Sequence, residues 1–137
     1  MIELTLEIAE QAARAARAKA EDLGIVMTVA VVDESGRTVL VMRGNGASFT
    51  SPETSRAKAV TAANFRRSTK ELEAGIAPNS AFWAAAPAVL HGEVLPSKGG
   101  VPIMRDGRCI GAIGCGGGTS EQDHECAEAG ADAAASI

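Results

Sequence analysis

Aromatic residues are scarce in this chain of 137 residues, which has three Phe, one Trp and no Tyr. Large rings usually supply much of the packing energy of a core. Small residues take their place, because the chain has 27 Ala and 15 Gly. We therefore expect helices that pack closely through small side chains, or apolar surface that is buried against another subunit. The few large rings are candidates for a pocket wall or a subunit contact: Phe49, Phe65, Phe82 and Trp83.

An excess of positive charge is also absent. The chain has 13 Lys and Arg against 17 Asp and Glu, which gives a formal net charge of −4 and a pI near 5.2. Nucleic-acid binding relies on basic surfaces, so we expect no nucleic-acid partner. No apolar run approaches the roughly 18 residues of a membrane-spanning helix, and the start, Met1-Ile2-Glu3, lacks the basic residues of a signal peptide. We therefore predict a cytoplasmic protein without a membrane partner.

Cysteine is rare, and the three cysteines, Cys109, Cys115 and Cys126, are an odd number that cannot pair completely within one chain. None of them stands in a C-x-x-C spacing typical of zinc sites. We interpret them as reduced thiols and assign no metal site. The length and composition are typical of one soluble domain, which we place at residues 1–137.

Hydrophobic periodicity and turn residues predict helices at both ends of the chain and two hairpins between them. Asp106-Gly107 is a strong hairpin signal, whereas residues 78–92 give no clear prediction. Two hairpins separated by helices favour an α+β fold with a mostly antiparallel sheet. The predicted elements are a helix at 4–23, strands at 25–32 and 37–42, a helix at 52–66, a short helix ending at Gly75, strands at 101–104 and 108–113, and a helix running toward 137.

A glycine-rich strand exit at 114–118 leads into Thr119-Ser120-Glu121-Gln122, a capping-box sequence that starts a helix. Backbone amides and the positive end of a helix favour an anion at such a place. Gly117, Gly118, Thr119 and Gln122 are therefore candidate binding residues for a carboxylate. The alternative is that the glycines only allow the chain to turn sharply behind the strand.

Several charged side chains are candidates for chemistry. Arg43 follows the second strand, and Lys58 lies in a helix otherwise lined by small apolar residues. A cation that projects from such a helix into a cavity can bind a carboxylate or react with a carbonyl group, although most lysines lie at the surface. Asp123, His124 and Glu125, at the start of the last helix, can move protons, but acids there are also favoured by the helix dipole alone.

Five short motifs occur in an order that resembles one family. They are Leu4-Thr5-Leu6-Glu7, Ala30-Val31-Val32-Asp33, Ala57-Lys58-Ala59, Gly99-Gly100-Val101-Pro102-Ile103, and the run from Gly111-Ala112-Ile113-Gly114 to Gly117-Gly118-Thr119-Ser120-Glu121-Gln122-Asp123. This pattern resembles the GlcG/HbpS family, also called the haem-degrading or DUF336 domain, which is related to the C-terminal domain of PduO-type adenosyltransferases. The resemblance implies a profilin-like three-layer α/β/α sandwich around a five-stranded antiparallel sheet, and it implies homo-oligomers.

The resemblance also implies a small-molecule binding protein, with haem or another anionic tetrapyrrole as its ligand. Arg43, Lys58, Gly99 and Gly100 would then rim the pocket together with the glycine-rich helix start, and His91 or His124 would be an axial ligand of the haem iron. One alternative is a catabolic enzyme that acts on a small unsaturated or keto carboxylate by hydrolysis, deamination or tautomerisation, using Lys58, Asp123, Glu125 or His124. Another is a non-catalytic oligomeric accessory protein.

Overall fold

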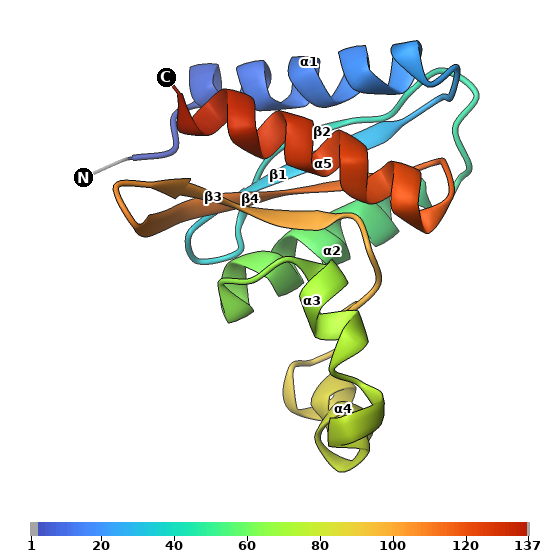
Figure 1. The fold of residues 1–137 in the computed structure, drawn as a ribbon, viewed down its shortest axis with the longest axis vertical. Coiled ribbons are helices and arrows are strands. Elements are labelled where there is room, and N and C mark those ends of the chain that lie inside the picture. Colours follow the sequence, from blue (N-terminus) through green and yellow to red (C-terminus); the bar gives the residue numbers. More distant parts are fainter. Residues whose placement is uncertain (1–2, 137) are drawn as a thin grey trace.

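The structure, a computed structural model, describes residues 3–136 (Figure 1). Its elements follow the predicted order, with a helical segment added where the sequence gave no clear prediction. Within the described residues, no helix is long and apolar enough to cross a membrane. The elements are α1 (Leu6–Asp22), β1 (Thr28–Asp33), β2 (Thr38–Met42), α2 (Ser51–Phe65), α3 (Thr69–Ala74), the 3-10 helix η1 (Ala77–Asn79), α4 (Ser80–Val89), β3 (Gly100–Arg105), β4 (Arg108–Gly116) and α5 (Ser120–Ala135).

Within residues 3–136 the sheet has four strands in the order β2-β1-β4-β3, and every neighbouring pair is antiparallel. The α+β class and the antiparallel sheet are confirmed, but the prediction of five strands is wrong. The residue pattern predicts four strands, and the fifth is implied by the family resemblance alone; the segment between α2 and β3 forms α3, η1, α4 and a loop. Its alanine-rich stretch at 84–88 favours a helix over a strand. The profilin-like assignment stays a prediction.

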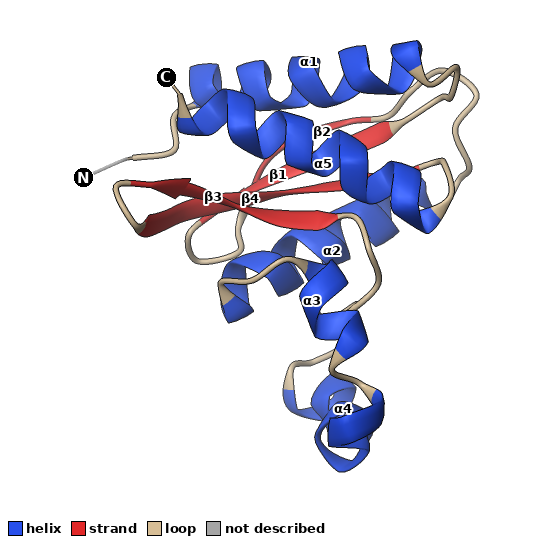
Figure 2. Cartoon of the chain, in the orientation of Figure 1, coloured by secondary structure: helices blue, strands red, loops and turns tan. Residues whose placement is uncertain are grey.

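Helices cover both faces of the sheet, with α1 and α5 on one face and α2 on the other (Figures 1 and 2). Strand side chains alternate between the faces, so Val29 and Val31 face the first layer while Val32 faces the second. Small residues dominate both cores: the first includes Ala9, Ala12, Ala13, Ala16, Ala127 and Ala134, and the second includes Ala59, Ala62, Ala63 and Ala112.

Local signals place the ends of several elements as the sequence predicts. Thr5 accepts a hydrogen bond from the Ile8 amide (3.2 Å) at the start of α1, and Gly24 follows its end with a φ of +70°. Asp106 and Gly107 both have positive φ angles, 50° and 74°, as a tight hairpin between β3 and β4 requires. The predicted hairpins are therefore confirmed.

Glycines let the helices approach the sheet closely. A Cβ atom added to Gly114 on β4 would overlap the carbonyl oxygen of Ser55 and stand 2.8 Å from the amide nitrogen of Ala59, both on α2. A Cβ atom added to Gly130 on α5 would stand 2.7 Å from the carbonyl oxygen of Ala12 on α1. Both helical layers thus contact their neighbours with backbone rather than with large side chains, as the scarcity of aromatic residues led us to expect.

Helix α4 stands apart from the layered body (Figure 2). It follows α3 and η1 away from the sheet, and Ala86 is its one buried residue. We call the segment from Gly75 to Leu90 the α4 arm.

We predict that Gly114→Ala lowers the free energy of unfolding by about 1–3 kcal/mol, the usual cost of overpacking a core. The added methyl group would push α2 off the sheet. Gly75→Ala is the control, because its added Cβ meets no atom closer than 3.4 Å and its φ is −90°. Urea unfolding of both variants would measure the difference, and equal stabilities would contradict the close approach of α2 to β4.

Candidate functional site

A buried ion pair joins the two helical layers. The Nζ atom of Lys58 on α2 lies 3.1 Å from Oδ2 of Asp123 on α5 and donates to the carbonyl oxygen of Cys115 at 3.0 Å. The side chains of Lys58 and Asp123 are only 8% and 7% exposed. Lys58 is therefore not a surface lysine, and two of the four residues predicted to move protons are in direct contact.

Two glycines at the start of β3 make room for this pair. A Cβ atom added to Gly99 would stand 3.0 Å from both Cδ of Lys58 and Cβ of Asp123, and one added to Gly100 would overlap the backbone carbonyl of Lys58. Gly99 also has a φ of +128°, which favours glycine. Gly99 is therefore required by its packing against the side chains of the ion pair, and Gly100 is required by its packing against the backbone of α2.

The start of α5 already holds a carboxylate, that of Asp123. The amide of Gly118 donates to Oδ1 of Asp123 at 2.9 Å. The predicted capping box is confirmed, because the Gln122 amide donates to the Thr119 hydroxyl at 3.2 Å and the Thr119 amide donates to the Gln122 side chain at 3.0 Å. An added Cβ at Gly117 would overlap the carbonyl oxygen of Val26. Anion binding by Gly117, Gly118, Thr119 and Gln122 stays a prediction, and a ligand would have to displace Asp123 from the Gly118 amide.

Burial is the largest cause of the pKa shifts of the acidic groups around this ion pair. It raises the pKa of Asp123 above its usual value, although the Lys58 ammonium and the Gly118 amide both favour the carboxylate. Burial also raises the pKa of Cys115 well above its usual value and that of Cys126 to about 11. Both sulfurs are therefore protonated and poorly nucleophilic at neutral pH. Cys109, Cys115 and Cys126 are all buried and free.

The other predicted site residues do not join the ion pair. Arg43 lies in the loop between β2 and α2, where it donates to the carbonyl of Ala47 at 3.0 Å and lies over the Phe49 ring, 5.3 Å from the centroid. Glu125 is exposed on α5, and His91 is exposed directly after α4.

His124 is buried on α5. Its Nε2 lies 3.4 Å from a carboxylate oxygen of Glu128, and its Nδ1 has no hydrogen-bond partner. Among residues 3–136 no cluster of three or more His, Cys, Asp or Glu side chains offers a metal site.

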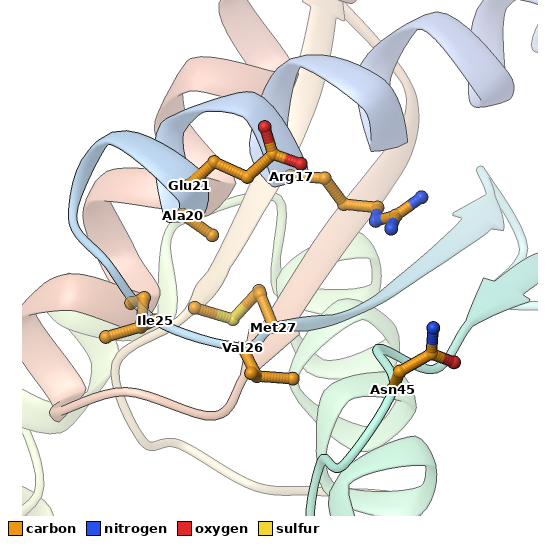
Figure 3. Close-up of a pocket in the computed structure, with 7 residues that line it drawn as sticks. All are labelled: Arg17, Ala20, Glu21, Ile25, Val26, Met27 and Asn45. Carbon is orange, nitrogen blue, oxygen red and sulfur yellow. The ribbon is translucent and has the colours of Figure 1, made fainter.

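A small pocket of about 180 Å³ lies between the end of α1 and the entry to β1 (Figure 3). Arg17 and Glu21 come from α1, and Asn45 comes from the loop after β2. Met27 and its neighbours Ile25 and Val26 supply apolar carbon. The sequence analysis did not single out Arg17, because one arginine on the polar face of an amphipathic helix carries no distinguishing signal. The pocket is too small for a macrocycle and suits a ligand of a few heavy atoms.

An apolar pocket of about 520 Å³ lies between the end of α2 and the α4 arm. Three of the four aromatic residues gather here: the Phe65 ring centroid is 5.4 Å from that of Trp83 and 6.2 Å from that of Phe82. Phe65 and Phe82 also line a neighbouring pocket of about 340 Å³ that includes Arg67. The apolar pocket is lined by Asn64, Phe65, Phe82, Ala85, Ala86, Val89 and Leu90.

The sequence predicts only part of the lining of this apolar pocket. The scarcity of aromatic residues made Phe65, Phe82 and Trp83 candidates for a pocket wall, and they line these two pockets. The sequence of the α4 arm gives no clear secondary-structure prediction, so it does not place Leu90 at a site. Arg67 lies between α2 and α3 and is not singled out by the sequence either. His91 directly follows Leu90, which puts an imidazole next in sequence to the pocket lining.

We predict that Lys58→Met and Asp123→Ala each lower the free energy of unfolding by about 3–5 kcal/mol, because each leaves a buried group without its partner. The double variant is expected to lose less than the two single losses together.

A pH series distinguishes the charge from simple packing. Without the ammonium of Lys58, the folded pKa of Asp123 rises further above the unfolded value of 3.8. A raised folded pKa in an acid means that stability is greatest below the unfolded value and falls as the pH rises through the folded one. Urea unfolding of Lys58→Met should therefore show a steeper loss of stability with rising pH than the wild type. Parallel pH profiles would refute this account.

Comparison with known proteins agrees with the motif pattern. A family model described as "Haem degrading protein HbpS-like" matches residues 4–132. The 15.0 kDa protein in the dhaT-dhaS intergenic region of Citrobacter freundii is 34% identical over 129 residues, which are 94% of this chain and 90% of that protein.

Solved structures agree as well. The crystal structure of Klebsiella pneumoniae ORFY, a DUF336 protein, has a TM-score of 0.90 at 29% identity and covers 98% of this chain and 92% of its own. The crystal structure of a PduOC:heme complex has a TM-score of 0.85 at 32% identity and covers 95% of this chain and 94% of its own. These matches span nearly the whole chain and confirm the resemblance carried by the motifs. The chain belongs to the HbpS-like family.

Proposed function

We propose that this protein binds haem or a related anionic tetrapyrrole in the pocket between α2 and the α4 arm. The observation that carries the proposal is the aromatic and aliphatic lining of that pocket, whose volume of about 520 Å³ lies in the range typical of small-molecule sites. A flat macrocycle needs apolar walls, and the Phe65 and Phe82 rings line this pocket.

The polar residues nearby suit the rest of such a ligand. Arg67, in the neighbouring pocket that shares Phe65 and Phe82, would pair with a propionate. His91, directly after Leu90, would be the axial ligand of the iron. Bound haem would supply a redox-active iron.

Relatives support this ligand class. The family description names haem degradation, and a solved relative that matches 95% of this chain is described as a haem complex. Self-association and a cytoplasmic location also remain proposals, the first from the family and the second from the sequence.

The glycine-rich helix start is a second binding position predicted from the sequence, with Arg43, Lys58, Gly99 and Gly100 around it. Its geometry supports it less, because the Lys58 ammonium and the Gly118 amide are both engaged by Asp123. The same pairing leaves the acid and base proposed for a catabolic enzyme, Lys58 and Asp123, satisfied by each other.

We predict that haem titrated into the purified protein gives a saturable change in the Soret band. Phe82→Asp should weaken binding by about tenfold or more, since about 1.4 kcal/mol of lost contact is enough for that change. Val41→Asp is the matched control, because Val41 is also exposed, at 39%, but lies on β2 far from the α4 arm in Figure 1. Equal binding by Phe82→Asp and wild type would exclude this pocket.

The axial ligand has its own test. His91→Ala should change the Soret position and the spin state of the bound iron, whereas His124→Gln should leave both unchanged. The reverse result would move the iron site to α5. If Lys58→Met weakens haem binding while Phe82→Asp does not, the ligand binds at the glycine-rich helix start instead of the apolar pocket.

A further inference from the structure

The small pocket between the end of α1 and the entry to β1 collects polar groups that the proposed haem site does not use. Arg17 and Glu21 lie four residues apart on α1, and Asn45 lines the pocket from the loop after β2 (Figure 3). Within residues 3–136 the Arg17 guanidinium and the Glu21 carboxylate have no ion-pair partner, whereas Arg14 on the same helix pairs with Glu10 at 3.3 Å. Both pocket charges are therefore available to a ligand.

The base of this pocket is fixed by close backbone packing. A Cβ atom added to Gly44 would stand 2.6 Å from the carbonyl oxygen of Met27, and one added to Gly117 would overlap the carbonyl oxygen of Val26. The entry to β1 is thus held between two glycine-containing loops. Met27 is buried and Val26 is half-exposed, so together they give the pocket an apolar base. This base is present before any ligand arrives.

Asn45 is held in place by a β-turn. The Ala47 amide donates to the carbonyl oxygen of Gly44 at 3.0 Å, and Gly46 has a φ of +85°, so Asn45 occupies the second position of the turn. Figure 3 shows the Arg17 side chain extending from α1 toward the side of the pocket where Asn45 lies. A guanidinium and an amide group both offer N–H donors, so this side of the pocket suits a carboxylate.

The other side of the pocket favours a cation. Glu21 is the last residue but one of α1, which ends at Asp22. The carbonyl end of a helix carries a partial negative charge, and the Glu21 carboxylate adds a full one. A ligand with a carboxylate alone would be repelled here, whereas an ammonium group would be stabilised. The pocket therefore pairs hydrogen-bond donors on one side with negative charge on the other.

We infer that this pocket binds a small apolar α-amino acid in its zwitterionic form. The ligand carboxylate binds Arg17 and Asn45, its ammonium group binds Glu21, and its side chain packs on Val26 and Met27. The volume of about 180 Å³ equals that of about six water molecules at roughly 30 Å³ each, which is enough for alanine or valine but too small for an aromatic amino acid.

This site is separate from the proposed haem site. The two pockets share no lining residue, since one lies at the end of α1 and the other between α2 and the α4 arm. Amino-acid binding therefore requires no haem, and its failure would leave the haem proposal untouched.

The first test locates the site. L-Valine is titrated into the ¹⁵N-labelled full chain, and the side-chain amide of Asn45 and the backbone amide of Val26 are followed by NMR. Saturable shifts of both signals are expected at millimolar concentration or below, as a ligand of about eight heavy atoms allows. Arg17→Met should weaken binding by about tenfold or more, and Glu21→Gln by about fivefold or more. Arg14→Met is the matched control, because Arg14 lies on the same helix outside the pocket, and it should bind as wild type.

The second test defines the ligand class. Isovalerate lacks the ammonium group of valine and isobutylamine lacks its carboxylate, so each should bind about tenfold more weakly than L-valine or worse. L-Phenylalanine should not bind. The site is overturned if neither L-alanine nor L-valine gives saturable shifts over the millimolar range, or if Arg17→Met binds L-valine as tightly as Arg14→Met does. Isovalerate binding as tight as that of L-valine would overturn the assignment to amino acids.

Discussion

Close approach of backbones is the constraint on which the rest of this structure depends. The strands carry no large rings on either face, so α2 lies directly on Gly114 and α5 lies directly on α1 through Gly130. Dispersion contacts are then made by many small groups rather than by a few large ones. Such packing leaves little room for adjustment, because a single added methyl group at Gly114 meets backbone atoms that cannot rotate away.

The buried pair of Lys58 and Asp123 follows from this constraint. With glycines at the start of β3, a lysine on one helical layer can reach a carboxylate on the other around the end of the sheet. Ion pairs of this kind cost desolvation and add little net stability, but breaking one partner is costly. The pair links the two layers, and it places the Asp123 carboxylate on the Gly118 amide, where a helix start would otherwise attract an external anion.

Local signals predict most of this fold, whereas long-range contacts explain what the sequence leaves open. Caps at Thr5 and Thr119 and the turn at Asp106-Gly107 are encoded by neighbouring residues, so the helix starts and the hairpin are found without tertiary information. A fifth strand is implied by the family resemblance alone, because the sequence has four β-rich segments and these form the four strands. Lys58 and Asp123 are 65 positions apart, and the sheet brings them together. The sequence therefore predicts both as candidate site residues but does not indicate that they form an ion pair with each other.

The same constraint explains why the large side chains gather at the α4 arm. A sheet covered this closely on both faces has no space for Phe65, Phe82 and Trp83, so these rings pack on one another at the end of α2 and on α4. The body places its own carboxylate at the glycine-rich helix start, while the apolar pocket of about 520 Å³ is lined by the end of α2 and the uncharged α4 arm. Substitutions in the α4 arm therefore leave the packing of the sheet undisturbed, whereas substitutions at Gly114 or Gly130 force a helix away from its neighbour.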